Sequence, residues 1–224
     1  MESYFQELIG KTIEIEISGG NYHKGILIDA GLDIIVIYNG RENTFLYIPF
    51  VHVQRLKESL PDENFNMTEP PTVKPIESEL ISFRKILMTA KGLFVQVYVT
   101  GNKSIHGYLT SIMNDFFVFH SPIYKTMYIS MNHVKWLIPF PQDTTPYTLT
   151  DDKLLLSRPS VPLARSFKDQ LKKFENKLVI LDGGDNPEKI GLLQEVNSQK
   201  VTLITAEGET LFRNLEHIKT IQLP

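Results

Sequence analysis

One pattern occurs three times along the 224-residue chain, and this repeat constrains the fold more than any other feature of the sequence. Each copy has a glycine followed by an apolar residue and a leucine. Further along, each has a histidine followed by a β-branched residue, a polar residue, any residue and an apolar residue. The glycine precedes the histidine by 27 residues in the first copy and by 26 in the other two. The markers are Gly25, Gly107 and Gly191, and His52, His133 and His217. This spacing predicts three tandem copies of one small unit.

The order of predicted elements is the same in every copy. A short amphipathic helix comes first, followed by a strand with period-2 alternation, as in Ile13, Ile15 and Ile17. A Gly/Asn-rich turn, a second strand, a third strand with a continuous apolar run and two short closing strands complete the copy. We therefore expect a mainly β protein made of three Sm-like or SH3-like barrels, each a short helix plus five bent antiparallel strands. The marker glycine is expected to permit the bend that closes each barrel.

Two proline-containing stretches separate the copies. Residues 58–77 and 141–164 hold eight of the 13 prolines, and proline resists both helix and sheet. We expect linkers there, and barrels over residues 1–57, 78–140 and 165–224. The second linker contains three leucines, 154–156, which are candidates for docking on a neighbouring barrel.

Composition excludes several classes of protein. Hydrophobic residues are 42% and charged residues 22%, which fits a chain with packed cores. The absence of cysteine excludes disulfides, thiol nucleophiles and Cys-ligated metals. No apolar run approaches the ~18 residues that a membrane span requires. The N-terminus lacks the features of a signal peptide, so we expect synthesis in the cytoplasm.

The repeated histidines are the only ionisable residues that recur at one position in all three copies. No serine, cysteine or carboxylate keeps a fixed offset from them. We therefore expect the imidazoles to bond local backbone groups and to have a structural role, with a ligand or acid/base role as the less favoured alternative.

Other candidate sites are weaker still. His23 and His106 precede their glycines in hairpin loops, and a metal ion bridging them is disfavoured. Glu14 and Glu16 share one strand face, but the pair does not recur, which indicates a solvated face. We expect no enzymatic activity, no cofactor and no metal.

The middle copy differs from its neighbours in charge and in aromatic content. Residues 78–140 carry a net charge of +4, beside −4 for residues 58–77, and hold 11 of the 23 aromatic residues. A barrel of this size cannot bury eleven rings, so several should pack between copies or face a partner. Either the acidic linker covers this copy or an acidic partner protein does. The candidate partner surface comprises Arg84, Lys85, Lys103, Lys125, Trp136 and Phe140.

RNA binding is the alternative function, because Sm-like barrels often bind single-stranded RNA. Their sites use an Asp-x-apolar-Asn string and an Arg-Gly string. Here the first aligns with Asp33-Ile-Ile-Val, which lacks the asparagine, and no Arg-Gly occurs. The net charge of −3 also removes the electrostatic drive toward nucleic acid. Nucleic-acid binding is therefore disfavoured.

The strings GGDNPEKIGLL and LEHIKTI of the third copy, and GGNYHKGIL and FVHVQRL of the first, resemble the repeats of CotB-type spore coat proteins of Bacillus. The resemblance covers all three copies. It implies a spore coat component, made in the mother-cell cytoplasm, that acts through contacts with other coat proteins. Those proteins continue into a Ser/Lys-rich tail, whereas this sequence stops at Leu223-Pro224, so nothing that depends on the tail is expected here.

Overall fold

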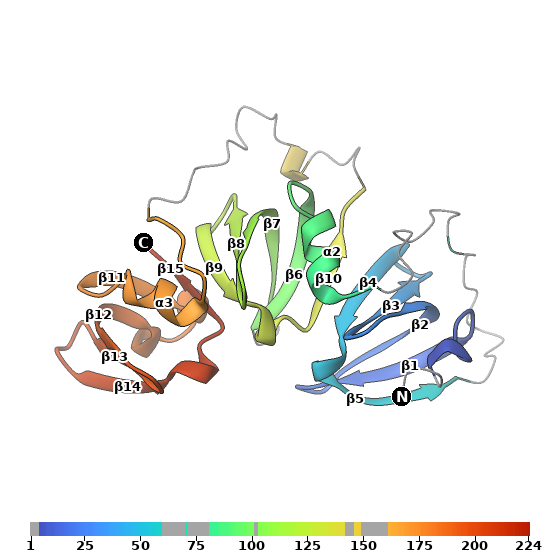
Figure 1. The fold of residues 1–224 in the computed structure, drawn as a ribbon, viewed down its shortest axis with the longest axis horizontal. Coiled ribbons are helices and arrows are strands. Elements are labelled where there is room, and N and C mark those ends of the chain that lie inside the picture. Colours follow the sequence, from blue (N-terminus) through green and yellow to red (C-terminus); the bar gives the residue numbers. More distant parts are fainter. Residues whose placement is uncertain (1–4, 60–69, 71–80, 101–102, 142–145, 149–160) are drawn as a thin grey trace.

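In the computed structural model the chain is mainly β, as the sequence predicts (Figure 1). The structure describes residues 5–59, 70, 81–100, 103–141, 146–148 and 161–224. Within them, 15 strands form one antiparallel sheet, accompanied by two α-helices. Most of the two predicted linkers, including residues 154–156, lies outside the described residues.

The elements fall into three successive units. Unit 1 contains β1 (Thr12–Ile17), β2 (Asn21–Ala30), β3 (Ile34–Asn39), β4 (Thr44–Pro49), the 3-10 turn η1 (Phe50–His52) and β5 (Val53–Glu58). Unit 2 contains α2 (Phe83–Thr89), β6 (Phe94–Thr100), β7 (Lys103–Ile112), β8 (Phe116–Ser121), β9 (Lys125–Ser130), η2 (Met131–His133) and β10 (Trp136–Pro139), followed by η3 (Pro146–Thr148). Unit 3 contains α3 (Phe167–Lys172), β11 (Lys177–Leu181), η5 (Asp182–Gly184), η6 (Pro187–Lys189), β12 (Ile190–Val196), β13 (Lys200–Ile204), β14 (Thr210–Asn214), η7 (Leu215–His217) and β15 (Thr220–Gln222).

Strand order is identical in the three units. The first four strands are consecutive neighbours, and the fifth pairs with the first, giving β4-β3-β2-β1-β5 in unit 1 and its equivalents in units 2 and 3. The fifth strand of each later unit also pairs with the fourth strand of the preceding one, β10 with β4 and β15 with β9. The sheet therefore runs through all three units as an open arc that ends at β14 and β5 (Figure 1).

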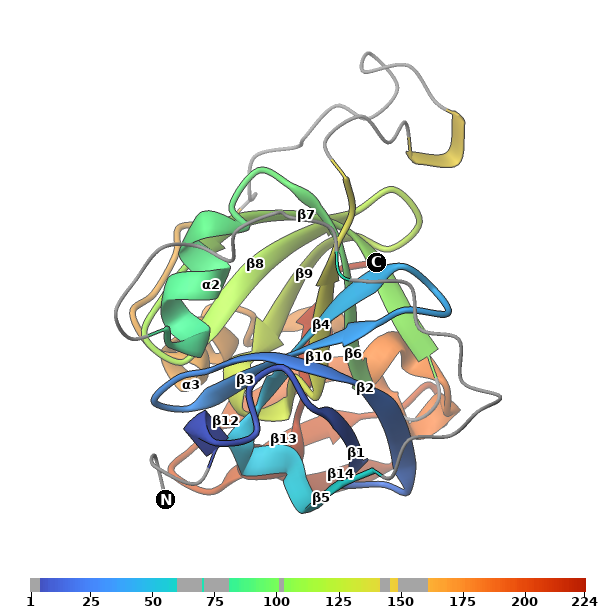
Figure 2. The same cartoon turned by 90° about the vertical axis from the view of Figure 1, so that its right-hand side faces the viewer.

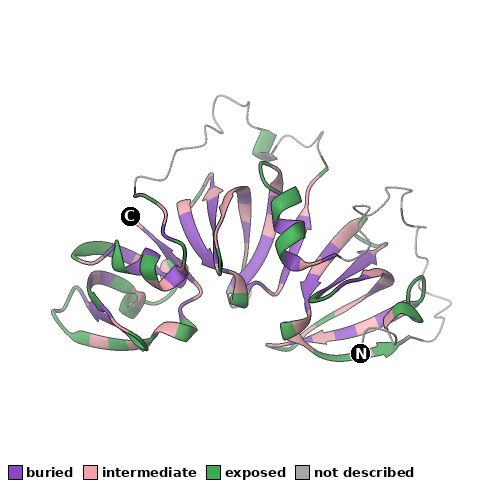
Figure 3. Ribbon diagram, viewed as in Figure 1, coloured by how far each residue is buried: buried purple, intermediate pink, exposed green. Residues whose placement is uncertain are grey.

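Burial follows the alternation in the sequence. The inward isoleucines of β1 are buried, whereas the residues between them are partly exposed. The third strands β3 and β8 are buried almost throughout, as their continuous apolar runs predict. The reason is that each has two packing faces. Ile35 and Ile37 belong to the core cluster of unit 1, while Ile34 and Val36 belong to that of unit 2. Figure 3 shows that the central strands are largely buried and that β14 and β5 are mostly exposed.

The two helices begin with similar caps. Ser82 precedes α2 and accepts a hydrogen bond from the Lys85 N–H, and Ser166 precedes α3 and accepts one from the Asp169 N–H. The sequence predicts the second of these caps. Both helices lie on the same side of the sheet (Figure 2). Their apolar faces join the cores of their own units through Phe83 and Leu87 in α2 and through equivalent residues in α3.

The marker glycines occupy one position in three strands. They lie opposite the second residue of β1 and β6 and the third of β11. A Cβ at any of them would overlap a backbone carbonyl oxygen of the third strand. Only glycine allows the second and third strands to approach this closely. The structure thus gives the glycines a more specific role than a general bend.

Replacing Gly107 by alanine should therefore destabilise the protein by about 1–3 kcal/mol, because the added methyl group meets the backbone carbonyl of His120, which cannot rotate away. Chemical denaturation followed by circular dichroism measures this. Gly92→Asn is the matched control. Gly92 has φ 81°, but the equivalent residue after α3 is Asn176 with φ 63°, so asparagine should be tolerated. Equal losses of stability in Gly107→Ala and Gly92→Asn would contradict the explanation that the second and third strands approach too closely for a Cβ.

Candidate functional site: the seams between units

The surfaces at which consecutive units meet, here called the seams, contain both polar and apolar contacts between distant parts of the sequence. At the first seam β10 pairs with β4, with Leu137 opposite Tyr47. At the second seam β15 pairs with β9 over three residues, with Ile221 opposite Tyr128 at the centre. Both seams are thus continuations of the sheet, and each also involves side chains from both units.

An aspartate before the third strand links each unit to the helix of the next. The Asp33 Oδ1 accepts a hydrogen bond of 2.7 Å from the Phe83 N–H, the first residue of α2. The Asp115 Oδ1 accepts one of 2.7 Å from the Phe167 N–H, the first residue of α3. The first N–H groups of a helix have no partner within it, and the helix dipole favours a negative charge there. These aspartates therefore fix where each helix begins relative to the preceding unit.

Backbone hydrogen bonds reinforce this contact. The Leu32 N–H donates to the Ile81 carbonyl at 2.9 Å, and the Asn114 N–H donates to the Arg165 carbonyl at 3.0 Å. At the first seam, Gly31 leaves room for this approach, because a Cβ there would overlap the Ile81 carbonyl. The segment before each helix is thus bound to the preceding unit by backbone and side chain together.

Aromatic rings fill the first seam. Trp136 stacks on Tyr98 with ring centroids 3.8 Å apart and an interplanar angle of 10°, and the ring of His23 meets the indole edge-on at 4.7 Å. Tyr98 and Trp136 come from unit 2 but belong to the core cluster of unit 1. With 6% of its surface exposed, Trp136 is buried in the seam, so the alternative of packing between copies holds for this residue and the partner-surface interpretation does not.

The repeated histidines lie in η1, η2 and η7, three turns that meet on the concave side of the arc (Figure 1). Their contacts differ. The His52 Nδ1 is 3.1 Å from the Ser18 hydroxyl oxygen. The His133 Nε2 donates to the Glu216 carbonyl at 2.8 Å, across the second seam. His217, at the end of the arc, is exposed. The backbone group that His133 bonds thus belongs to the next unit and not to its own.

Burial lowers the pKa of the ionisable side chains in and beside these turns. It is the largest cause of the lowered pKa of His52, and the Lys135 ammonium adds to it. Burial also lowers the pKa of His133, partly offset by its hydrogen bond to Glu216. The pKa of Lys135 is lowered by burial and then by Lys219, and its ammonium donates to the Ser18 carbonyl across the first seam. On the concave side the two imidazoles are therefore favoured in their neutral form, and the Lys135 ammonium makes the charged contact across the first seam.

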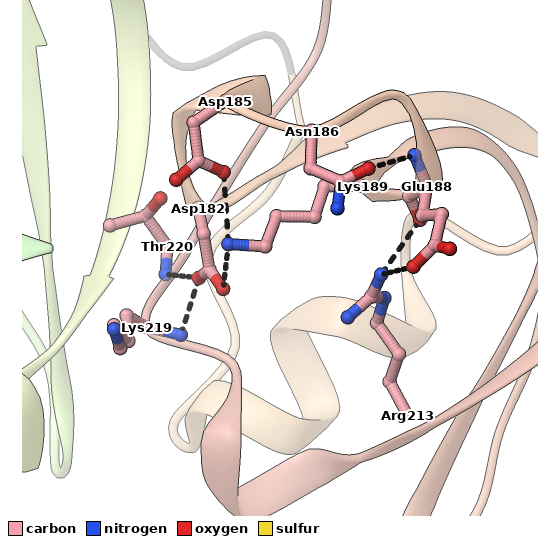
Figure 4. A network of polar contacts seen from close by, with 8 residues as sticks. All are labelled: Asp182, Asp185, Asn186, Glu188, Lys189, Arg213, Lys219 and Thr220. Atoms are coloured by element: carbon pink, nitrogen blue, oxygen red, sulfur yellow. Dashed lines mark hydrogen bonds and ion pairs between the residues drawn. The ribbon is translucent and has the colours of Figure 1, made fainter. Parts of the chain in front are cut away.

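An ion-pair network supports the second seam from unit 3 (Figure 4). The Asp182 Oδ1 accepts hydrogen bonds from the N–H groups of Lys219 (2.8 Å) and Thr220 (3.1 Å), at the start of β15. The Lys189 ammonium lies 3.6 Å from the other oxygen of Asp182 and 2.9 Å from Asp185. Asp182 thus fixes the start of the strand that pairs with unit 2.

The remaining residues of the predicted partner surface are spread over several elements. Arg84 in α2 donates to the carbonyls of Met113 (2.7 Å) and Asn114 (3.2 Å), beside the second seam. Lys85 in α2 and Lys125 at the start of β9 are exposed. Phe140 follows β10 and is half-buried. The side chain of Lys103 lies outside the described part of the structure.

The described residues contain no group of three or more His, Asp or Glu side chains placed to hold a metal ion. Among the helices of the same part of the chain, none has the length and apolar character needed to cross a membrane.

Replacing Asp115 by alanine should lower the free energy of unfolding by about 1–3 kcal/mol, because the first N–H of α3 loses its acceptor. Urea denaturation of the whole chain measures this. Gln199→Ala is the matched control: Gln199 precedes β13 as Asp115 precedes β8, but it is exposed and lies at the end of the arc. Its replacement should change stability by less than about 0.5 kcal/mol. If Asp115→Ala left the free energy of unfolding unchanged, the capping role would be contradicted.

Stability should also decrease as the pH falls below about 6.5. Five histidines, 23, 52, 106, 120 and 133, have a pKa lowered from 6.5, with burial as the largest cause. The unfolded chain therefore binds protons near pH 6.5 that the folded chain resists, so stability is complete above that pH and is lost as the pH falls through the lowered values.

Calorimetric melting between about pH 7.5 and 5.5 tests this, a range above the usual titration of carboxylates. His133→Gln retains a donor for the Glu216 carbonyl and should reduce the slope. A melting temperature independent of pH over this range would show that the burial of these rings does not control their protonation.

Comparison with known proteins shows one relative over nearly the whole chain. The sequence is 40% identical over 222 residues to the uncharacterized protein YwrJ of Bacillus subtilis (strain 168), covering 97% of this chain and 98% of that protein. A family model for the YwrJ third domain matches residues 166–221, which extend from α3 into β15. Identity at this level and length shows that this chain belongs to the YwrJ family.

Proposed function

We propose that this protein is a structural interaction protein of the spore coat, in which three Sm-like barrels form a stiff arc that binds other proteins. In this proposal the barrels are residues 1–57, 78–140 and 165–224, and no catalytic step takes place. The observation that carries the proposal is that strand pairing, side-chain hydrogen bonds and buried aromatic rings all join consecutive units. The aspartate-to-helix bonds, the shared strands and the buried Trp136 all contribute to a fixed arrangement of units.

Stiffness favours a scaffold over a set of independently moving binding modules. A chain of repeats joined by extended interfaces presents a long surface of defined curvature, which is suited to contacts with several partners. The coat assignment is supported by the resemblance of the repeat strings to CotB-type proteins and by the relative in a Bacillus species.

Locating the protein during sporulation tests this proposal. We expect a fluorescent fusion to surround the forming spore, and the untagged protein to be recovered only in alkali or detergent extracts of purified spores. Abundance in the vegetative cytoplasm would refute the coat assignment. An electrophoretic mobility shift abolished by ribonuclease would instead support the RNA-binding alternative.

The arc geometry can be tested in the same cells. The double variant Asp33→Ala, Asp115→Ala removes both aspartate-to-helix bonds and should loosen the arc. We expect larger dimensions in solution scattering and reduced recovery in spores, whereas Gln199→Ala should match the wild type in both measurements. If the double variant had larger dimensions but were recovered in spores as well as the wild type, partners would recognise single units and not the arc.

A further inference from the structure

The β11–β12 outer face of unit 3 is an apolar surface exposed to solvent. Its four side chains form two cross-strand pairs, Leu178 opposite Leu192 and Ile180 opposite Ile190. Neighbouring residues on these strands point the other way, into the core, because side chains alternate along a strand. Leu178 is 61% exposed and Ile190 is 42% exposed. Four aliphatic side chains on the solvent face of one strand pair form a patch rather than a scatter of single residues.

The equivalent face of unit 2 is covered by the protein's own chain. There, Phe94 lies opposite Tyr108. The segment after β10 returns over this face. Phe140 donates its N–H to the Phe94 carbonyl at 3.0 Å, and its ring lies 5.2 Å from that of Phe94. The ring of Tyr147 meets Phe94 edge-on at 6.1 Å, and that of His106 lies 5.9 Å from Phe140.

The equivalent face of unit 1 is mostly polar. Its cross-strand pairs are Thr12 with Ile26 and Glu14 with Lys24, and the last two side chains form an ion pair of 3.7 Å. The Ser59 N–H donates to the Thr12 carbonyl at 2.9 Å, as Phe140 does in unit 2. A solvated face of this kind needs no cover. Unit 3 therefore differs from both: its two pairs are aliphatic, whereas unit 2 has Gln96 opposite His106 beside its Phe94 pair, and Leu178 and Ile190 remain exposed.

The residue that would continue the pattern in unit 3 is Pro224. It lies seven residues after the repeated histidine His217, as Ser59 and Phe140 lie seven residues after His52 and His133. Proline has no N–H and cannot make the hydrogen bond that the other two make. The backbone hydrogen bond with which the covering segment of unit 2 begins therefore cannot form at this position of unit 3.

The residues just before Ile190 in the chain carry paired charges, whose contacts Figure 4 shows. Lys189, which immediately precedes Ile190, is held by Asp182 and Asp185. Arg213 of β14 donates to the Glu188 carbonyl at 3.0 Å and lies 3.4 Å from its carboxylate. Each of these charges pairs with an opposite charge nearby. The four side chains of the β11–β12 outer face are uncharged. The surface is therefore suited to an uncharged, apolar segment of a ligand.

We propose that the β11–β12 outer face binds an extended peptide segment of a partner protein that carries an aromatic side chain, as Phe140 and Tyr147 cover the same face of unit 2. This inference rests on the proposed interaction function and names its partner class. The patch of four side chains is far smaller than the roughly 20–30 residues a side of a standard protein interface. It therefore suits a short segment better than a second copy of the folded chain.

Methyl NMR of the full chain tests the proposal. The probe is a synthetic peptide with the sequence of residues 137–148, LIPFPQDTTPYT, which contains both aromatic residues of the covering segment. We expect saturable shifts of the methyl signals of Leu178, Ile190 and Leu192. A peptide with both aromatic residues replaced by alanine should bind at least about tenfold more weakly, because each ring loses its burial.

The variant Leu178→Lys should weaken binding of the intact peptide by about tenfold or more. Val51→Lys is the matched control, since Val51 is 75% exposed in unit 1, and it should leave binding unchanged. Both positions are exposed, and circular dichroism will show whether each variant folds.

Two results would overturn the proposal. One is the absence of methyl shifts at this face at millimolar peptide, or shifts that persist in Leu178→Lys. The other is self-association in sedimentation that Leu178→Lys abolishes, which would assign the face to a second copy. Peptide binding to a protein that does not enter spores would leave this inference intact and refute only the coat assignment.

Discussion

Pairing of the fifth strand of one unit with the fourth strand of the preceding unit is the interaction on which the arrangement of this protein depends. It joins β10 to β4 and β15 to β9, so the sheet does not end where a unit ends. The bond from Asp33 to α2, and its equivalent from Asp115 to α3, add a second, directional contact at each junction. Two such contacts fix both the position and the rotation of a unit relative to its neighbour.

The free ends of the arc carry different residues from the seams. The first and third residues of β3 and β8 are apolar and buried, whereas β13 has Lys200 and Thr202 at these positions. At the other end, an ion pair of 3.2 Å between Glu16 and Arg55 occupies the position of the stacked Tyr98 and Trp136. Charged residues at an edge disfavour further strand pairing. The internal seam surfaces are therefore not repeated at the two ends of the described sheet.

Local patterns in the sequence predicted the repeat, the alternation of β1 and the cap at Ser166, because each depends on residues close together in the chain. The contacts at the seams could not be predicted from such local patterns. The Asp33 to Phe83 bond joins residues 50 positions apart, and neither residue is unusual in its own segment. The aromatic character of Trp136 leaves open whether it packs between copies or faces a partner, because it gives no information on which side of the strand meets another unit. Only the tertiary arrangement separates a buried seam from an open surface.

This arrangement also explains why the middle unit contains so many aromatic residues. An end unit contributes to one seam, but unit 2 contributes to two. Tyr98 and Trp136 pack into the core cluster of unit 1. On the opposite side, Phe116 lies 5.9 Å from Phe167, and Tyr128 lies 5.0 Å from the ring of Phe174 in unit 3. The rings of the middle unit are thus distributed among three cores. The aromatic content of the middle unit therefore reflects its position between two neighbours.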